Sequence, residues 1–289
     1  MRCLQKYSMI YTSTSCLKNP KNIIKVLEEY QRLGIENVEL GSVHAYFKIE
    51  QLKKFHFNYI IHNYFPPQKN PFNFNLASQD ATLRKKSLTL AKEAIELCRK
   101  IDSPIYTFHA GFTVDPKKLG SKMDYSIIPK RSKSITTYLD AVTELTDFAS
   151  SYDIMLGMEP NVVQKFNLIN NENKLLLFAE LDEIKILLKL FNKNKLGILL
   201  DLGHTSVTSH WLKFDKNLFV NKIKNRVVAI HISNNNGISD QHKSLINNCW
   251  QLKTLKKFKD IPITLESMNL SGNEIINNLN LIENQLKVI

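Results

Sequence analysis

Eight short apolar segments recur along the 289-residue chain, and polar loops separate each from the next. The segments are rich in branched and aromatic residues and show almost no alternation of polar and apolar positions. This pattern is typical of parallel strands that are covered on both faces. The segments are YSMIYTS from Tyr7, NVEL from Asn37, NYIIH from Asn58, PIYTFH from Pro104, IMLGME from Ile154, LGILLD from Leu196, VVAIHI from Val227 and PITLE from Pro262.

Between these segments, apolar residues recur with the spacing of amphipathic helices. The predicted helices cover residues 20–33, 80–101, 133–152, 181–191, 250–258 and 273–288. Strands that alternate with helices predict an α/β fold, a single-domain (β/α)8 TIM barrel over residues 1–289, with an open doubly wound sheet as the alternative. The first strand is followed by neither a GxGxxG nor a GxxxxGK[ST] turn, which weakens a nucleotide-binding version of that alternative.

Composition places few limits on function. No apolar run reaches the roughly 18 residues of a membrane span, and the N-terminal segment lacks the apolar stretch of a secretory signal, so we expect a cytoplasmic protein. The four cysteines (Cys3, Cys16, Cys98 and Cys249) have no CxxC spacing, which argues against a thiolate zinc site and against a disulfide framework.

The formal net charge of +12 is compatible with a surface for nucleic acid or another polyanion. However, only six of the 39 basic residues are Arg, the side chain that binds phosphate with two oxygens at once. The lysines are spread over many segments rather than gathered in one stripe. This favours a general compositional bias over a dedicated polyanion face, and it leaves a phosphorylated or acidic small substrate open.

Ionisable residues stand at the ends of six consecutive predicted strands, where the chemistry of a parallel barrel is found. They are His62, His109, Glu159, Asp201, His231 and Glu266, and the following loops add His204, Asp240 and His242. Any one of them alone is more commonly a hydrogen-bonding or helix-capping residue. A set of such groups at one barrel mouth would be costly to desolvate unless cations compensated them. We therefore predict a divalent metal site, and we assign no role to His44, His56 and His210.

These residues lie within motifs that resemble the xylose isomerase-like barrel superfamily, which includes sugar isomerases and epimerases and the DNA-repair enzyme endonuclease IV. The resemblance runs from about Ser8 to Glu266, and each motif alone is weakly specific. Their order on successive strands is strongly specific. The motifs are IIHNYFPP, NFNLASQDATLRKKSL, FHAGF, GMEPN, LLDLGHT, HISNNNGISDQHKSL and TLESMN.

The resemblance implies two alternative sets of metal ligands. Epimerases of the family that use one ion bind it through residues that match Glu159, Asp201, His231 and Glu266. Endonuclease IV holds three zinc ions with nine ligands, and each ligand has a counterpart here. By resemblance, the first ion would be held by His62, His109 and Glu159, the second by Glu159, Asp201, His231 and Glu266, and the third by His204, Asp240 and His242.

Three departures bear on which reaction the resemblance implies. The sequence after His242 continues as KSLINN, without the Gly-rich loop of endonuclease IV. The second predicted strand leads into ELGSVHAYF, which lacks the Arg/Gln-rich loop with an aromatic tip that endonuclease IV inserts into DNA. In the opposite direction, no obvious Arg follows His231, where some epimerases place a substrate-binding one.

The resemblance implies an enzyme, and two reactions stay open, beside a metal-binding barrel with another lyase or hydrolase activity or with none. The first is isomerisation or epimerisation of a sugar or sugar phosphate, in which Glu159 and Glu266 transfer a proton through an enediolate and His204 binds a substrate hydroxyl. The second is endonuclease IV-like zinc-dependent hydrolysis of abasic-site DNA, which the missing DNA-entry loop opposes, because base flipping needs a side chain that fills the stack.

We favour the sugar reaction, with one to three Zn²⁺ or Mn²⁺ ions as cofactors; Co²⁺ also fits histidine and carboxylate ligands without thiolate. The expected partner is a small-molecule sugar or sugar phosphate rather than nucleic acid, and no membrane partner is expected. The sequence does not indicate the oligomeric state.

Overall fold

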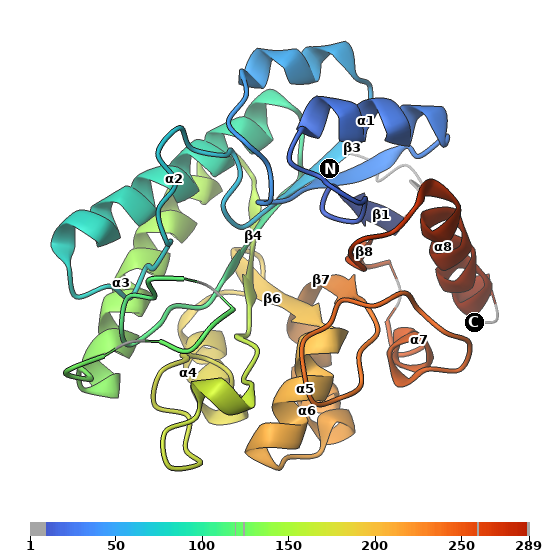
Figure 1. The fold of residues 1–289 in the computed structure, drawn as a ribbon. Coiled ribbons are helices and arrows are strands. Elements are labelled where there is room, and N and C mark those ends of the chain that lie inside the picture. Colours follow the sequence, from blue (N-terminus) through green and yellow to red (C-terminus); the bar gives the residue numbers. More distant parts are fainter. Residues whose placement is uncertain (1–9, 119, 124, 259, 288–289) are drawn as a thin grey trace.

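The computed structural model describes residues 10–118, 120–123, 125–258 and 260–287, and in it eight parallel strands close into a barrel in sequential order (Figure 1). Pairing of Thr12 in the first strand with Leu265 in the last closes the sheet. The strands are β1 (Ile10–Ser13), β2 (Asn37–Leu40), β3 (Asn58–His62), β4 (Ile105–His109), β5 (Met155–Glu159), β6 (Leu196–Asp201), β7 (Val227–Ile232) and β8 (Ile263–Leu265). The predicted TIM barrel is confirmed, and the open-sheet alternative is wrong. Residues 7–9 of the first predicted strand, Cys3 and residue 288 lie outside the described residues.

Helices form a ring around the strands (Figure 1). They are α1 (Ile23–Arg32), α2 (Ala81–Lys100), α3 (Arg131–Ser150), α4 (Leu181–Leu190), α5 (Leu202–Leu212), α6 (Lys216–Ile223), α7 (Trp250–Leu255) and α8 (Gly272–Lys287). Short 3-10 helices are η1 (Ile49–Lys54), η2 (Lys165–Asn167) and η3 (Lys224–Arg226). No helix in the described part of the chain combines the length and the hydropathy that a membrane crossing requires.

Two helices and one connection differ from the pattern that the sequence predicted. Helix α5 was not predicted because all residues from Leu202 to Thr208 are buried, so its sequence shows no amphipathic period. Helix α6 is short and was also missed; it begins after Asp215, whose carboxylate accepts hydrogen bonds from the first turn. Between β2 and β3 the chain forms only the 3-10 helix η1.

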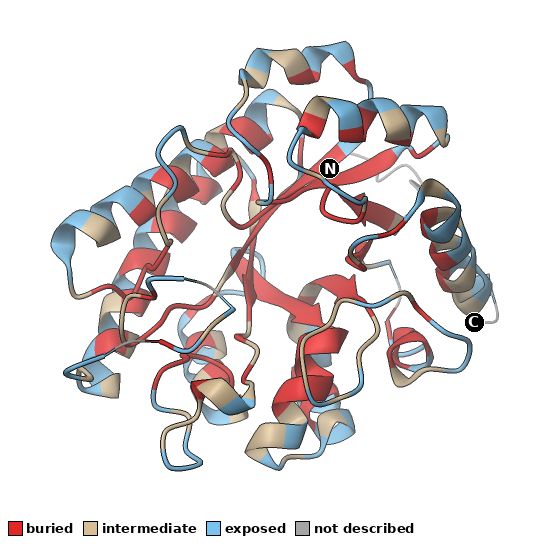
Figure 2. Cartoon of the chain, viewed as in Figure 1, coloured by how far each residue is buried: buried red, intermediate tan, exposed pale blue. Residues whose placement is uncertain are grey.

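The strands are largely buried on both sides, whereas most helices bury the face that contacts the sheet and expose the other; the first seven residues of α5 are all buried (Figure 2). Ile61 belongs to the large core between the strands and the helices. Its neighbour Ile60 belongs to a separate apolar cluster, together with Tyr11, Ile105, Leu199 and Ala229. Because alternate side chains of a strand point to the same face, Ile60 and His62 both face the interior of the barrel.

This inner apolar cluster lies one layer below the predicted metal ligands. Leu199 and Ala229 precede Asp201 and His231 by two residues, as Ile60 precedes His62. Side chains inside such a barrel fill it in layers. The ionisable residues therefore form the uppermost layer, above an apolar floor.

Gly157 lets two strands approach closely just below this layer. A Cβ atom at Gly157 would lie 2.8 Å from Cγ2 of Thr107 on the neighbouring strand β4. That separation is too short for two carbon atoms, so a larger residue would displace Thr107 or the backbone of β5. Gly157 precedes Glu159 by two residues and therefore faces the same side of the sheet.

Candidate metal centre

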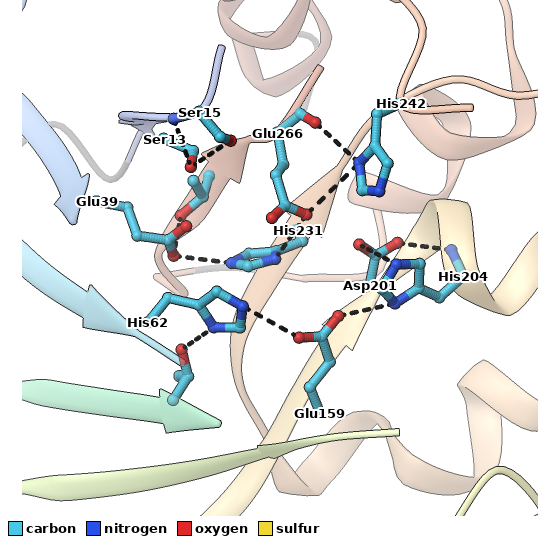
Figure 3. A network of polar contacts seen from close by, with 12 residues as sticks. Ser13, Ser15, Glu39, His62, Glu159, Asp201, His204, His231, His242 and Glu266 are labelled. Carbon is cyan, nitrogen blue, oxygen red and sulfur yellow. Dashed lines mark hydrogen bonds and ion pairs between the residues drawn. The ribbon is translucent and has the colours of Figure 1, made fainter. Parts of the chain in front are cut away.

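The barrel brings all six predicted strand-end residues to one mouth. The strands end in His62 (β3), His109 (β4), Glu159 (β5) and Asp201 (β6), while His231 is next to last in β7 and Glu266 follows β8 directly. The three predicted loop residues join them from α5 and from the loop after β7. Together the nine side chains form four groups at the C-terminal end of the barrel, three of which share residues. Figure 3 shows many of these side chains.

Glu159 is fully buried and lies at the centre of the first group. Its Oε2 atom is 3.4 Å from Nε2 of His62 and 3.3 Å from Nδ1 of His109. Potential ligand atoms of these three residues all lie within 4.8 Å of one another, so they could hold one ion. His62 is oriented by its other ring nitrogen, Nδ1, which lies 2.9 Å from Oγ1 of Thr107. This group has the composition that the resemblance implies for the first ion.

The residues of the second predicted set are found in two groups that share His231, and one of these groups also contains His62. Glu159, Asp201 and His231 place ligand atoms within 4.8 Å of one another, and so do His62, His231 and Glu266. Oε2 of Glu266 is 3.1 Å from Nδ1 of His231. Asp201 also caps helix α5, because its Oδ1 accepts a hydrogen bond of 2.7 Å from the backbone N–H of His204. Capping and metal binding can therefore use different oxygens of the same carboxylate.

The third group consists of residues outside the strands. Oδ2 of Asp240 lies 3.3 Å from Nε2 of His204 and 3.1 Å from Nε2 of His242. Nδ1 of His242 lies 3.0 Å from the backbone carbonyl oxygen of Glu266, to which it can donate. The backbone N–H of Asp240 donates to the side-chain oxygen of Gln164 at 3.0 Å, which joins this loop to the one after β5. His242 has a φ of 44°, a left-handed conformation that is uncommon for a residue other than glycine.

Unpaired polar atoms indicate that these residues fit a divalent cation. Buried polar groups are normally hydrogen-bonded. Several buried atoms of the cluster nevertheless make no hydrogen bond: both carboxylate oxygens of Glu159, Oδ2 of Asp201, Oδ1 of Asp240, and Nδ1 of His109, His204 and His231. Imidazole nitrogens and carboxylate oxygens are the ligands that Zn²⁺ and Mn²⁺ accept. Carboxylate oxygens and imidazole nitrogens of the cluster also face one another, as at Glu159 and His109, so a cation bound between them would contact both kinds of atom.

The cluster also perturbs its own acid–base equilibria. Burial lowers the pKa of His109 to about 4, which keeps this ring neutral. Burial raises the pKa of Glu159, but His109 and His204 outweigh it and bring the pKa down to about 2. Burial, together with the Glu159 carboxylate, raises the pKa of Asp201 to about 7 against the opposing effect of His204. Burial lowers the pKa of His242, but Asp240 outweighs it and raises the pKa to about 9.

A cavity of about 240 Å³ opens above this cluster. On one side it is lined by His62, His109, His204, Asp240, His242 and Glu266. The other walls offer hydroxyl and amide groups from Ser13, Ser15, Ser42, Asn63, Asn161 and Gln164, and apolar surface from Phe112 and Phe166. Among the described residues that line the cavity, none is Lys or Arg. Glu159 is fully buried beneath this surface and is not a lining residue.

The structure adds residues to the site that the sequence did not single out. Glu39, inside strand β2, is 1% exposed and lies 2.8 Å from Nε2 of His231 through its Oε2 atom. A carboxylate between Val38 and Leu40 in a short predicted strand was the available signal. Thr107 and Gln164 contact His62 and Asp240 as described above, and nothing in their sequence context distinguishes them.

The three histidines without an assigned role lie outside the groups that could hold a metal. His44 is buried between the carbonyl oxygen of Pro20 and the hydroxyl of Thr14, at 2.6 and 2.7 Å. His56 and His210 are exposed. The cysteines that the structure describes are free.

The closed parallel barrel and the carboxylate–histidine cluster at its mouth define a TIM-barrel protein with a candidate metal centre. A family model described as xylose isomerase-like TIM barrel matches residues 26–287, and the chain belongs to this family. An uncharacterized protein of Methanocaldococcus jannaschii is 26% identical over 281 residues, which are 94% of this chain and 94% of the relative.

Solved structures resemble the chain over almost its whole length. A D-tagatose 3-epimerase-like protein superposes with a TM-score of 0.71 at 19% identity, over 96% of this chain and 97% of that chain. An AP endonuclease, family 2, of Brucella melitensis superposes with a TM-score of 0.62 at 13% identity, over 92% of this chain and 95% of its own. At these sequence identities the likeness shows a shared fold. The similar structures include proteins named for both predicted reaction classes, an epimerase and an AP endonuclease.

Proposed function

We propose that the protein is a divalent-metal-dependent isomerase or epimerase of a sugar. The observation that carries this proposal is the cavity of about 240 Å³, which places a metal-binding cluster against walls of hydroxyl and amide groups. The volume lies below the roughly 300 Å³ at which drug-sized sites begin, so it suits a small molecule. Hydroxyl and amide side chains can both donate to and accept from the hydroxyls of a sugar.

Two carboxylates are proposed to transfer the proton. One removes a proton from the carbon next to the substrate carbonyl, and the electron pair of that C–H bond forms the double bond of an enediolate. The other returns a proton to the carbon skeleton. Glu266 lines the cavity, whereas Glu159 lies behind the histidines that it contacts. We therefore assign the first contact with the substrate carbon to Glu266 and the partner role to Glu159.

The histidines of the cavity wall are proposed to orient the substrate and the cofactor. His204 lines the cavity, and in a one-ion enzyme its ring donates to a substrate hydroxyl. In a three-ion enzyme His204 instead acts as a ligand together with Asp240 and His242. A bound divalent ion would stabilise the negative charge that develops on the substrate oxygens.

The lining of the cavity supports a neutral sugar over a phosphorylated one. Recognition of a phosphate group favours Arg or Lys, and the described lining residues contain neither. Lys122, Lys165 and Lys243 are each adjacent in sequence to lining residues without being lining residues themselves. The basic residues that give the chain its net charge of +12 therefore do not line the cavity.

Hydrogen exchange tests the proposed reaction. The protein loaded with Mn²⁺ or Zn²⁺ is incubated in D₂O with D-fructose or with D-fructose 6-phosphate, and proton NMR follows the signals next to the carbonyl. We expect deuterium to enter the neutral ketose, and chelator or Glu266→Gln to abolish the exchange. A survey of neutral and phosphorylated ketoses that detects no exchange would exclude the proposal.

A second function is favoured by the third ligand group. A one-ion epimerase does not need His204, Asp240 and His242 as ligands, yet the structure brings them within 4.8 Å of one another. This group matches the set that the resemblance assigns to endonuclease IV. Metal-dependent incision of a DNA duplex with an abasic site, abolished by chelator, would support a phosphodiesterase instead.

A further inference from the structure

Glu39 lies inside the barrel, where it contacts a histidine of the candidate metal centre. Its Oε2 atom is 2.8 Å from Nε2 of His231 and accepts a second hydrogen bond from Oγ1 of Thr264 at 3.1 Å. The other oxygen, Oε1, is buried without a hydrogen-bond partner. Figure 3 shows Glu39 on the side of the His231 ring that faces away from Glu266.

This contact determines which nitrogen of His231 carries hydrogen. An ionised carboxylate only accepts hydrogen bonds, so Nε2 of His231 must donate. In a neutral imidazole the lone pair then belongs to Nδ1. That atom faces Oε2 of Glu266 at 3.1 Å and makes no hydrogen bond of its own. The contact with Glu39 therefore presents the lone pair of His231 to the candidate metal groups.

A buried carboxylate in this position also requires compensation. Burial of a charge is costly unless cations or several hydrogen bonds offset it. Glu39 is 1% exposed, and neither Lys nor Arg forms an ion pair with it among the described residues. Its hydrogen-bonding partners are Thr264 and His231, and of these two only His231 can carry positive charge or bind a cation.

We propose that Glu39 is a positioning residue of the metal centre: it sets the tautomer of His231, increases the basicity of Nδ1, and makes the metal site that uses His231 the tightest one. The other histidines with an orienting contact have weaker partners. His62 contacts the hydroxyl of Thr107, and His242 contacts a backbone carbonyl. A carboxylate partner strengthens a histidine ligand more than a neutral one does.

Metal titration of two Glu39 variants tests this proposal. Glu39→Gln keeps the size of the side chain and one acceptor oxygen but removes the charge, whereas Glu39→Leu removes both. We expect the affinity of the tightest site for Zn²⁺, measured by chelator competition, to fall about 10-fold in Glu39→Gln and towards 100-fold in Glu39→Leu. The visible spectrum of bound Co²⁺ should change in both variants, because the ligand field of His231 changes.

Glu183→Gln is the matched control. Glu183 is a mostly buried carboxylate of helix α4 that forms an ion pair with Arg131, outside the metal groups. The same substitution there should lower thermal stability without changing metal affinity or the Co²⁺ spectrum. This control separates a loss of stability from a loss of ligand orientation.

The outcomes do not depend on which reaction the protein catalyses. Unchanged affinity and an unchanged Co²⁺ spectrum in folded Glu39→Gln would overturn the positioning role, even if the variant were less stable. If Glu39→Leu does not fold, Glu39→Gln decides alone. Wild-type protein that binds no Zn²⁺ tightly would overturn both this inference and the proposed metal dependence. Tight binding without ketose exchange would overturn only the proposed reaction.

Discussion

The protonation of His242 should make the metal-free protein less stable as the pH rises. Asp240, 3.1 Å away, raises the pKa of His242 from 6.5 to about 9 despite the opposing effect of burial. A histidine with a raised pKa in the folded state stabilises that state fully below pH 6.5. This stabilisation is lost as the pH rises through about 9.

The size of the effect follows from the two pKa values. The interval between 6.5 and about 9, at about 1.36 kcal/mol for each pH unit, corresponds to about 3 kcal/mol of unfolding free energy. The His242 side chain is 14% exposed, so solvent screens the interaction only weakly. Most of the loss should occur between about pH 6.5 and about pH 9.5.

Urea unfolding in the presence of chelator measures this dependence. Wild-type protein and His242→Gln are compared at both ends of the pH range, so that titrations common to the two proteins cancel. We expect the wild type to lose about 3 kcal/mol more than the variant. Saturating Zn²⁺ should remove the difference in slope, because only a neutral histidine binds metal. Equal losses in the two metal-free proteins would refute the coupling between Asp240 and His242.

Three further substitutions test other parts of the site. Glu266→Gln should reduce turnover by at least about 100-fold with little change in thermal stability; an unfolded variant, or one with full activity, would contradict the assigned role. If the centre holds several ions, His109→Ala should lose one of them. If it holds a single ion, the variant should keep that ion and bind substrate more weakly. Gly157→Ala should lower the free energy of unfolding by about 1–3 kcal/mol, and by displacing Thr107 it should weaken metal binding by His62. Chemical denaturation measures the first effect and the number of bound ions measures the second. Wild-type stability together with a wild-type ion count would contradict the close approach of the two strands.

The barrel could be predicted because its strands are short apolar runs whose order leaves few topologies. The candidate ligands could be predicted because a parallel barrel brings the ends of its strands to one mouth. Helix α5 could not, since burial on all sides removes the polar face that makes a helix recognisable in sequence.

The grouping of the ligands and the role of Glu39 depend on side-chain directions that sequence does not specify. The resemblance placed Glu266 with Glu159, Asp201 and His231; in the structure its carboxylate forms a group with His231 and with His62. Glu39 and His231 are 192 residues apart, and only closure of the barrel brings strands β2 and β7 close enough for their side chains to meet across the interior. A carboxylate inside an apolar strand indicates a buried polar partner, but it does not indicate which one.

The number of divalent ions bound per chain decides whether the cluster is a metal centre. Elemental analysis of protein purified without chelator gives both the identity and the number of these ions. We expect more than one Zn²⁺ or Mn²⁺ per chain, because four groups built from histidines and carboxylates, three of them overlapping, occupy the barrel mouth. Protein that carries no divalent ion, and that takes up none when it is offered, would contradict the metal centre and the function proposed from it.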